Sequence, residues 1–240
     1  MTVPSFKSPF LPERPKFMST QKGYDLWSDL YDEEDNVLIL LEERFLLPML
    51  AAKQAREILD CGCGTGRISL WLANHFQDAR VTAIDFSDGM LSKAMKKDSL
   101  RKINWQVADL NKPFPLQKEI FDLITSTLVV EHIDHLENYF SEMRRVARPG
   151  ADIFVTGLHP AMHLFGISAR FKDPETKHDI MPHSHCHNIS TIFNRAIESG
   201  LLVKRMEEHY VDQTLIEAAP KAARYNGMPL LLLMHLTRED

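Results

Sequence analysis

The 240-residue sequence is poor in cysteine, in long apolar stretches and in clustered positive charge. Its three cysteines, Cys61, Cys63 and Cys186, lack the spacing of a disulfide framework, which favours reduced thiols and a cytoplasmic protein. No apolar run approaches the roughly 20 residues that a membrane-spanning helix requires. The net charge is -5 without a long basic run, so a nucleic-acid partner is not expected, because neutralising phosphates requires clustered Lys and Arg.

The first 20 residues also lack the apolar core of a signal peptide. They carry proline at positions 4, 9, 12 and 15, and such a composition favours an extended chain over a helix. We therefore predict a flexible arm over residues 1–20. The remaining residues, 21–240, suffice for a single domain with a full core.

Short apolar segments alternate with segments of helical periodicity along most of the chain. The strand-like segments include EILDCG, VTAID, INWQVAD, FDLITSTLVV and ADIFVTG. This alternation is typical of α/β folds, in which helices cover both faces of a mostly parallel, doubly wound sheet. The segment 158–187 fits no regular element, and it follows a strand at the edge of the sheet where such proteins bind ligands. We predict that it forms a loop or cap over the site.

A glycine-rich turn, DCGCGTG, joins the first of these strands to a helix. Gly62, Gly64 and Gly66 permit positive φ angles and a close approach of the backbone to a ligand, and the helix start offers unpaired N–H groups. The dinucleotide fingerprint is G-x-G-x-x-G, whereas here the third glycine comes one residue early and Asp60 precedes the first. This departure favours a cofactor that carries a carboxylate and an amine over one that carries a pyrophosphate.

The turn resembles the first motif of the class I S-adenosylmethionine (SAM)-dependent methyltransferases. Further motifs of that family occur in order between residues 24 and 156, ending with RVARPGADIFVT. The resemblance, which extends to the ubiquinone and menaquinone C-methyltransferase-like branch, implies SAM as the cofactor. It also implies a Rossmann-like sheet of seven strands in the order 3-2-1-4-5-7-6 with strand 7 antiparallel. The segment PLLLLMHLT near the C-terminus fits this seventh strand.

The same resemblance implies which residues bind the cofactor. Asp60, Gly62, Gly64 and Gly66 form the first of these motifs. Asp85, at the end of the second strand, is implied to hold the ribose hydroxyls, because one carboxylate accepts hydrogen bonds from two adjacent hydroxyls.

Four further positions complete the implied cofactor site. Phe86 is implied to pack on the adenine, and Asp109 and Leu110 are implied to face it. Thr127 lies at the end of the fourth strand, where family members contact the methionine part of the cofactor.

Candidate catalytic residues follow the fourth and fifth strands and begin a later helix. Glu131 and His132 follow the fourth strand, where they either act near the transferred methyl group or merely begin a helix. His159 follows the fifth strand, and His187 begins the helix before the sixth. Both histidines are candidate general bases, because an unperturbed imidazole titrates near neutral pH.

The run HSHCH raises the question of a metal site. Its three histidines, His183, His185 and His187, share a face if the segment is extended. No set of oxygen ligands for magnesium accompanies them, and Cys61 and Cys63 lack two further ligands at zinc spacing. We therefore predict no metal and interpret the run as a solvated loop.

Three aromatic residues precede the first long helix. Tyr24, Trp27 and Tyr31 lie in the segment 21–36, where they either pack the N-terminal helix onto the sheet or close over cofactor and acceptor. We favour a lid over residues 21–36, which keeps water from the reacting groups.

The sequence as a whole predicts a methyltransferase that acts on a small organic acceptor at oxygen, nitrogen or carbon. One alternative is a protein that binds SAM or its demethylated product without catalysis. Another is a methyltransferase that acts on a macromolecule. A nicotinamide-dependent oxidoreductase agrees less well with the glycine turn, and the sequence leaves the acceptor and the oligomeric state open.

Overall fold

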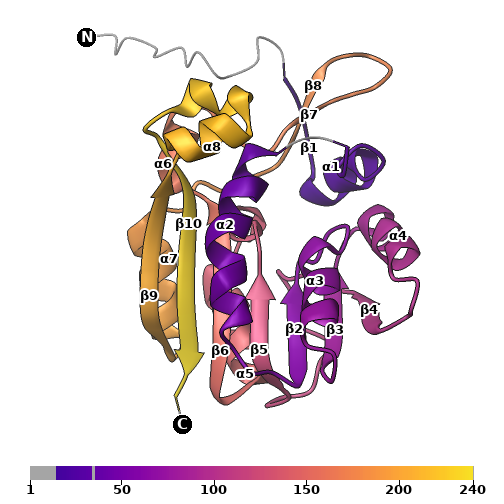
Figure 1. The fold of residues 1–240 in the computed structure, drawn as a ribbon, viewed down its shortest axis with the longest axis vertical. Coiled ribbons are helices and arrows are strands. Elements are labelled where there is room, and N and C mark those ends of the chain that lie inside the picture. The colour runs from indigo at the N-terminus through magenta and orange to yellow at the C-terminus, as the bar shows by residue number, and fades with distance from the viewer. Residues whose placement is uncertain (1–14, 34–35, 240) are drawn as a thin grey trace.

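The computed structural model describes residues 15–33 and 36–239 and consists of a central sheet flanked by helices (Figure 1). The sheet has seven strands in the order β4-β3-β2-β5-β6-β10-β9. These strands are β2 (Glu57–Cys61), β3 (Arg80–Asp85), β4 (Ile103–Val107), β5 (Phe121–Ser126), β6 (Ala147–Leu158), β9 (Leu201–Tyr210) and β10 (Pro229–Arg238). Counted in chain order, this is the predicted order 3-2-1-4-5-7-6.

Strand β10 is the antiparallel member that the sequence predicts. It pairs antiparallel with both β6 and β9, while β2 pairs parallel with β3 and with β5. Most of its residues are buried, which explains the run of four leucines from Leu230 to Leu233 in a strand covered on both faces.

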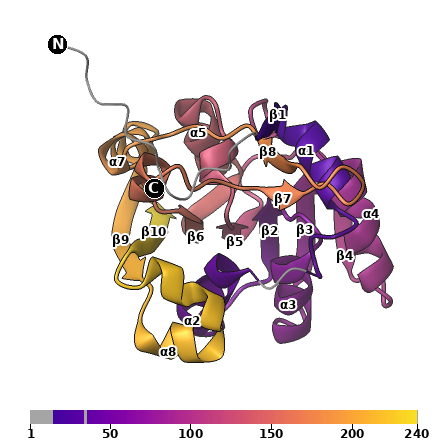
Figure 2. The same ribbon diagram turned by 90° about the horizontal axis from the view of Figure 1, so that it is seen from above.

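Helices cover both faces of the sheet, as Figure 2 shows. On one face lie α5 (Leu136–Val146) and α7 (Ile189–Glu198), and on the other lie α2 (Val37–Ala51) and α3 (Arg67–His75). The buried residues of α5 recur at helical spacing, namely Leu136, Tyr139, Phe140, Met143 and Val146. Helix α4 (Asp88–Lys97) begins at Ser87, whose side chain accepts a hydrogen bond from the Met90 N–H, as an N-cap residue does.

A second, smaller sheet lies above the carboxyl ends of the parallel strands (Figure 1). It has the order β1-β8-β7, formed by β1 (Lys16–Met18), β7 (Phe171–Lys172) and β8 (Asp179–Pro182). Strand β1 pairs parallel with β8 and leads into α1 (Thr20–Trp27). The second sheet therefore connects the N-terminal segment to the segment after β6.

Two predictions about these segments require correction. The arm predicted over residues 1–20 includes strand β1 and the start of α1, while residues 1–14 lie outside the described residues. The segment 158–187, predicted to be irregular, contains α6 (Pro160–Leu164) as well as β7 and β8. The physical reason is that β1 and β8 are formed by pairing with each other across about 160 residues, which no local periodicity records.

The last connection of the main sheet is also helical. Between β9 and β10 lie α8 (Gln213–Ala218) and the 3-10 turn η2 (Pro220–Tyr225). Within the described ranges, no helix is both long enough and apolar enough to cross a membrane.

Candidate functional site

The glycine turn lies at the carboxyl end of β2 and depends on glycine for two different reasons. Gly62 and Gly64 have φ angles of 72° and 53°. A Cβ atom on Gly62 would lie 2.4 Å from Cγ2 of Val129, so the turn packs directly against the end of the neighbouring β5 connection. A Cβ on Gly64 would meet nothing within 4 Å, because this glycine borders open space.

Asp85, the last residue of β3, fixes the turn from the adjacent strand. Its Oδ2 accepts a hydrogen bond of 2.8 Å from the Gly64 N–H, and its Oδ1 accepts one of 2.9 Å from the Ser87 N–H. Burial raises the pKa of Asp85 to about 6, although these backbone hydrogen bonds oppose the shift.

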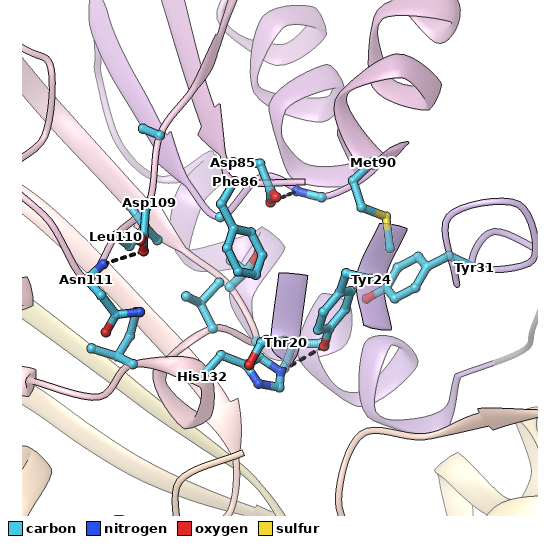
Figure 3. A pocket seen from close by; sticks show the side chains of 17 residues that line it. Thr20, Tyr24, Tyr31, Asp85, Phe86, Met90, Asp109, Leu110, Asn111 and His132 are labelled. Atoms are coloured by element: carbon cyan, nitrogen blue, oxygen red, sulfur yellow. Dashed lines mark hydrogen bonds between the residues drawn. The ribbon is translucent and has the colours of Figure 1, made fainter. Parts of the chain in front are cut away.

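A pocket of about 610 Å³, partly open to solvent, lies above this turn (Figure 3). Most of the predicted cofactor residues line it, namely Gly62, Gly64, Asp85, Phe86, Asp109, Leu110 and Thr127. Asn111 also lines it, a residue that the sequence motifs did not indicate, and its N–H donates 3.0 Å to Oδ1 of Asp109. In Figure 3, Asp109 and Asn111 lie on the side of the pocket opposite Tyr24. We call this the first pocket.

Two predicted cofactor residues, Asp60 and Gly66, do not line the first pocket. Asp60 is fully buried and accepts hydrogen bonds from the hydroxyls of Ser69 at 2.5 Å and Thr125 at 2.9 Å. It thereby joins β2 to α3 and β5 beneath the turn. Gly66 begins α3 and packs against Trp105, where a Cβ would approach the indole to 2.8 Å.

Helix α1 and the turn after it close over the first pocket. Tyr24 of α1 and Tyr31 of the turn line the pocket. The side-chain amide of Gln21 donates 2.8 Å to the carbonyl of Phe86, and Asp25 accepts 2.6 Å from the hydroxyl of Ser87. The helix is therefore attached to the loop that follows Asp85.

Tyr24 also contacts His132, which lines the same pocket (Figure 3). The tyrosine hydroxyl lies 2.8 Å from His132 Nε2, and His132 Nδ1 lies 3.1 Å from the carbonyl of His183. Since a carbonyl only accepts, Nδ1 carries the proton and Nε2 accepts from the tyrosine. Withdrawal from water lowers the pKa of His132 to about 4 and raises that of Tyr24 well above 10.

A second pocket of about 1150 Å³ adjoins the first. The two share Tyr24, Tyr31 and Leu128. The second pocket is further lined by residues of α2, β6, the segment after β6, η2 and β10, including Val37, Leu158, Ile167, Arg224 and Leu230. Glu131 and Trp27 line this pocket rather than the first.

The sequence of this chain is similar to those of known methyltransferases. Residues 59–155 match the family model described as a methyltransferase domain. An uncharacterized methyltransferase of Emericella nidulans is 27% identical over 88% of this chain and 87% of its own length. A ubiquinone/menaquinone biosynthesis C-methyltransferase of Desulfotalea psychrophila is 30% identical over 54% of each chain. A malonyl-[acyl-carrier protein] O-methyltransferase of Hahella chejuensis is 31% identical over 59% of this chain and 48% of its own.

A solved structure extends the similarity to the fold. The SAM-dependent methyltransferase of Mesorhizobium loti superposes with a TM-score of 0.69 at 24% identity, covering 85% of this chain and all of the other. Residues 59–155 therefore carry a methyltransferase domain, and the fold is that of the SAM-dependent methyltransferases. The chain spans most of the fungal relative but only about half of the two bacterial enzymes it matches.

S-adenosyl-L-methionine is bound in one solved structure of similar fold, the phosphoethanolamine N-methyltransferase 2 of Haemonchus contortus, which is 14% identical with a TM-score of 0.63 and covers 93% of this chain and 60% of the other. The residues present in this chain suit SAM, because the open space at Gly64 gives access to the backbone of the turn. The Asp85 carboxylate, at the same wall, retains lone pairs beyond the two that its backbone hydrogen bonds use.

Two candidate catalytic residues, Glu131 and His159, each have a buried side-chain atom without a hydrogen-bond partner among the described residues, and of the two only Glu131 lines a pocket. The side chain of Glu131 is 7% exposed, and Oε1 accepts from the Leu158 N–H at 3.3 Å. Its Oε2 has no partner among the described residues. Burial raises the pKa of Glu131 to about 7, and the charge of Glu42 acts in the same direction.

The other two histidine candidates line neither pocket. His159 is buried at the start of α6, where Nδ1 accepts 3.2 Å from the Ala161 N–H. His187 Nε2 lies 2.7 Å from the carbonyl of Ile133. Over residues 15–33 and 36–239, no three His, Cys, Asp or Glu side chains are grouped so as to hold a metal ion, and this includes the run His183–His187.

Proposed function

We propose that this methyltransferase transfers a methyl group from SAM to a small organic acceptor bound in the second pocket. The observation that carries the proposal is the continuity of the two pockets at Tyr24, Tyr31 and Leu128. A methyl group that leaves the first pocket at this junction enters the second directly. Alignment of donor and acceptor in this way removes much of the entropic barrier to a displacement.

Different residues of the first pocket contact different parts of the cofactor. Asp85 accepts hydrogen bonds from the ribose hydroxyls, and Phe86 and Leu110 pack against the adenine beside Asp109. The turn at Gly62 and Gly64, with Thr127, borders the methionine part. Asp60 and Gly66 act from beneath by holding the turn in place.

Bound SAM supplies a methyl group already activated on a sulfonium ion. The chain's own residues then need to exclude water and hold the acceptor. Helix α1 excludes water through its attachment to Phe86 and Ser87. The neutral His132 fixes the hydroxyl of Tyr24 at the junction of the pockets.

A small acceptor is favoured over a macromolecule by the shape of the site. Residues of α1, of the segment 158–187 and of η2 line the second pocket from several sides, as in the concave sites that bind small molecules. The name of one bacterial relative points to a small quinone-type acceptor, whereas that of the other points to a malonyl group carried on acyl-carrier protein. A protein that binds SAM without catalysis is the alternative outcome of the test.

The test is calorimetric titration with SAM and with NADH, followed by detection of methylated product across a panel of small acceptors. We expect SAM to bind and NADH not to bind. Asp85→Ala should weaken SAM binding by about 100-fold, because a buried carboxylate with paired hydroxyl contacts is lost. Asp78→Ala, at an exposed aspartate between α3 and β3, is the matched control and should bind as the wild type does.

SAM binding without any product would favour the non-catalytic alternative. No SAM binding by the wild type would contradict the proposed function as a whole.

A further inference from the structure

Two residues that line the second pocket each carry a buried polar atom that lacks a partner within the described part of the chain. One is Oε2 of Glu131, a hydrogen-bond acceptor, and the other is the Nε1–H of Trp27, a donor. The two side chains are only 7% and 5% exposed, and both line the pocket. Buried polar groups without partners are rare, because each loses its hydrogen bonds to water without compensation. Their position on residues that line one pocket indicates a ligand that satisfies both.

We propose that the methyl acceptor is a flat, largely apolar molecule with a hydroxyl group that donates to Glu131 and a second polar atom that accepts from Trp27. This inference rests on the proposed function and adds the class of acceptor and the residue that receives its proton.

The walls of the pocket suit a flat apolar body. Trp27 is itself held in place, stacked on Phe171 with ring centroids 5.1 Å apart and in edge contact with Tyr31 at 5.1 Å. Apolar side chains from α2, β6, the cap and β10 complete the lining, namely Val37, Leu38, Leu158, Ile167 and Leu230. An aromatic ring gains both apolar burial and ring contacts in such surroundings.

The neighbouring histidine is less suited to receive the proton. His132 donates through Nδ1 to a carbonyl, and Nε2 is occupied by the Tyr24 hydroxyl. Glu131 lines the second pocket and carries an oxygen without a described partner. Its pKa of about 7 suits a group that takes up and returns a proton near neutral pH.

The methyl transfer breaks two bonds and forms two. The O–H bond of the acceptor breaks and its proton goes to Oε2 of the ionised Glu131. A lone pair of the acceptor oxygen forms the new bond to the methyl carbon. The carbon–sulfur bond breaks with its electron pair remaining on sulfur, which converts the sulfonium to a neutral thioether. The products are a methyl ether and a protonated Glu131, which returns its proton to solvent after release.

Basic side chains in the second pocket make a carboxylate the main alternative to a hydroxyl as the methyl acceptor. Arg170, Lys221 and Arg224 also line the second pocket, and Arg224 lies over the ring of Tyr225 at 4.5 Å. A carboxylate acceptor would bind such groups and would need no base. The experiment therefore compares a hydroxyl, an ether and a carboxylate on one flat scaffold.

The probes are 7-hydroxycoumarin, 7-methoxycoumarin and coumarin-3-carboxylic acid, titrated into the full-length protein saturated with S-adenosylhomocysteine. We expect the hydroxyl compound to bind about tenfold more tightly than the ether, because only the hydroxyl donates to Glu131. Glu131→Met should abolish this preference. Trp27→Phe should weaken binding of the hydroxyl compound about threefold to tenfold while keeping an aromatic ring in place.

Two further variants separate binding from proton transfer. Glu131→Gln still accepts a hydrogen bond, so it should bind the hydroxyl compound within about threefold of wild type. It should nevertheless lose methylation of that compound by about 100-fold or more, because the amide takes up no proton. Glu175→Gln, at an exposed glutamate between β7 and β8, is the matched control and should behave as wild type in both assays.

Equal or tighter binding of the ether or the carboxylate, or no binding of any of the three, would overturn the inference. SAM titration of the same samples keeps the two proposals apart. If SAM binds and the hydroxyl preference is absent, only the acceptor class is wrong. If SAM fails to bind, the proposed function itself fails.

Discussion

The hydroxyl of Tyr24 lies 2.8 Å from Nε2 of His132, and this contact joins the N-terminal helix to the connection after β5 across 108 residues. It occurs where the two pockets meet, because Tyr24 lines both. The position of α1 and the protonation state of His132 are therefore linked. A histidine that carried a proton on both nitrogens would lose the hydrogen bond that the tyrosine donates.

His132 is expected to remain neutral throughout the physiological pH range. Withdrawal from water lowers its pKa to about 4, from an ordinary value of 6.5. Nitrogen-15 NMR of the labelled imidazoles should show the Nδ1–H tautomer from pH 8 down to about pH 5. Titration of this residue near pH 6.5 would mean that the Tyr24 contact does not hold in solution.

Glu131 should make the wild type less stable as the pH rises from about 4.5 to above 7. In this window the folded carboxyl keeps its proton, while the unfolded one, with its ordinary pKa of 4.5, releases it. The folded state thus binds more protons, so a rise in pH favours unfolding, by on the order of 3 kcal/mol in total. The ionisable groups that face Glu131 are Glu42, Tyr24, Tyr31 and Tyr139, and the three tyrosines stay neutral here because burial raises the pKa of each.

Urea unfolding of wild type and Glu131→Gln at pH 5 and pH 8 measures this contribution. The variant cannot titrate at this position, so it should gain stability relative to wild type as the pH rises. Other buried acids contribute equally to both proteins and cancel in the difference. A stability difference that does not change with pH would contradict the burial of an ionisable Glu131.

Alanine at the two glycines of the first pocket should have different consequences. Gly62→Ala forces a Cβ to within 2.4 Å of Val129, in addition to a positive φ, and should destabilise the fold by about 3 kcal/mol or more. Gly64→Ala meets no atom, so its cost should be only that of the positive φ, about 1–2 kcal/mol. Its methyl group borders the pocket, so SAM affinity should fall although the protein folds. Unfolding curves and SAM titration of both variants provide the check, and equal stability of the two would be inconsistent with the packing described.

Asp25 should control how long the cofactor stays bound. It accepts from the hydroxyl of Ser87 at 2.6 Å and from the Gly89 N–H at 3.2 Å, so Asp25→Ala detaches α1 from the loop after β3. We expect SAM to dissociate about tenfold faster, with a smaller change in association rate. Stopped-flow displacement measures this, with Asp78→Ala as control. An unchanged dissociation rate would show that α1 is not a lid.

The sequence allowed prediction of the main sheet, its strand order and most residues of the first pocket, because these depend on local periodicity and on a turn with a fixed spacing. It did not reveal the second sheet, since β1 and β8 are short and form only by pairing with each other. Nor did it separate residues that line a pocket from those that support it. Asp60 precedes the glycines as the motif requires, yet its register beside Thr125 turns it inward.

Catalytic candidates were the least predictable part of the site. His159 and Glu131 both follow strands at the same edge of the sheet, but only three-dimensional packing shows that Glu131 lines a pocket with an oxygen lacking a described partner. The buried cluster of Glu42 with Arg67 and Thr156 similarly joins α2, α3 and β6, three elements distant in the sequence. Such contacts arise from tertiary packing and leave no signal in spacing or composition.

The central claim is that the reactive end of SAM lies where the two pockets meet. Nuclear Overhauser spectra with SAM labelled with carbon-13 at its methyl group test this most directly. We expect cross-peaks from the labelled methyl to the rings of Tyr24 and Tyr31 and to the methyl groups of Leu128. Cross-peaks to other residues alone, with these three absent while SAM is bound, would contradict it.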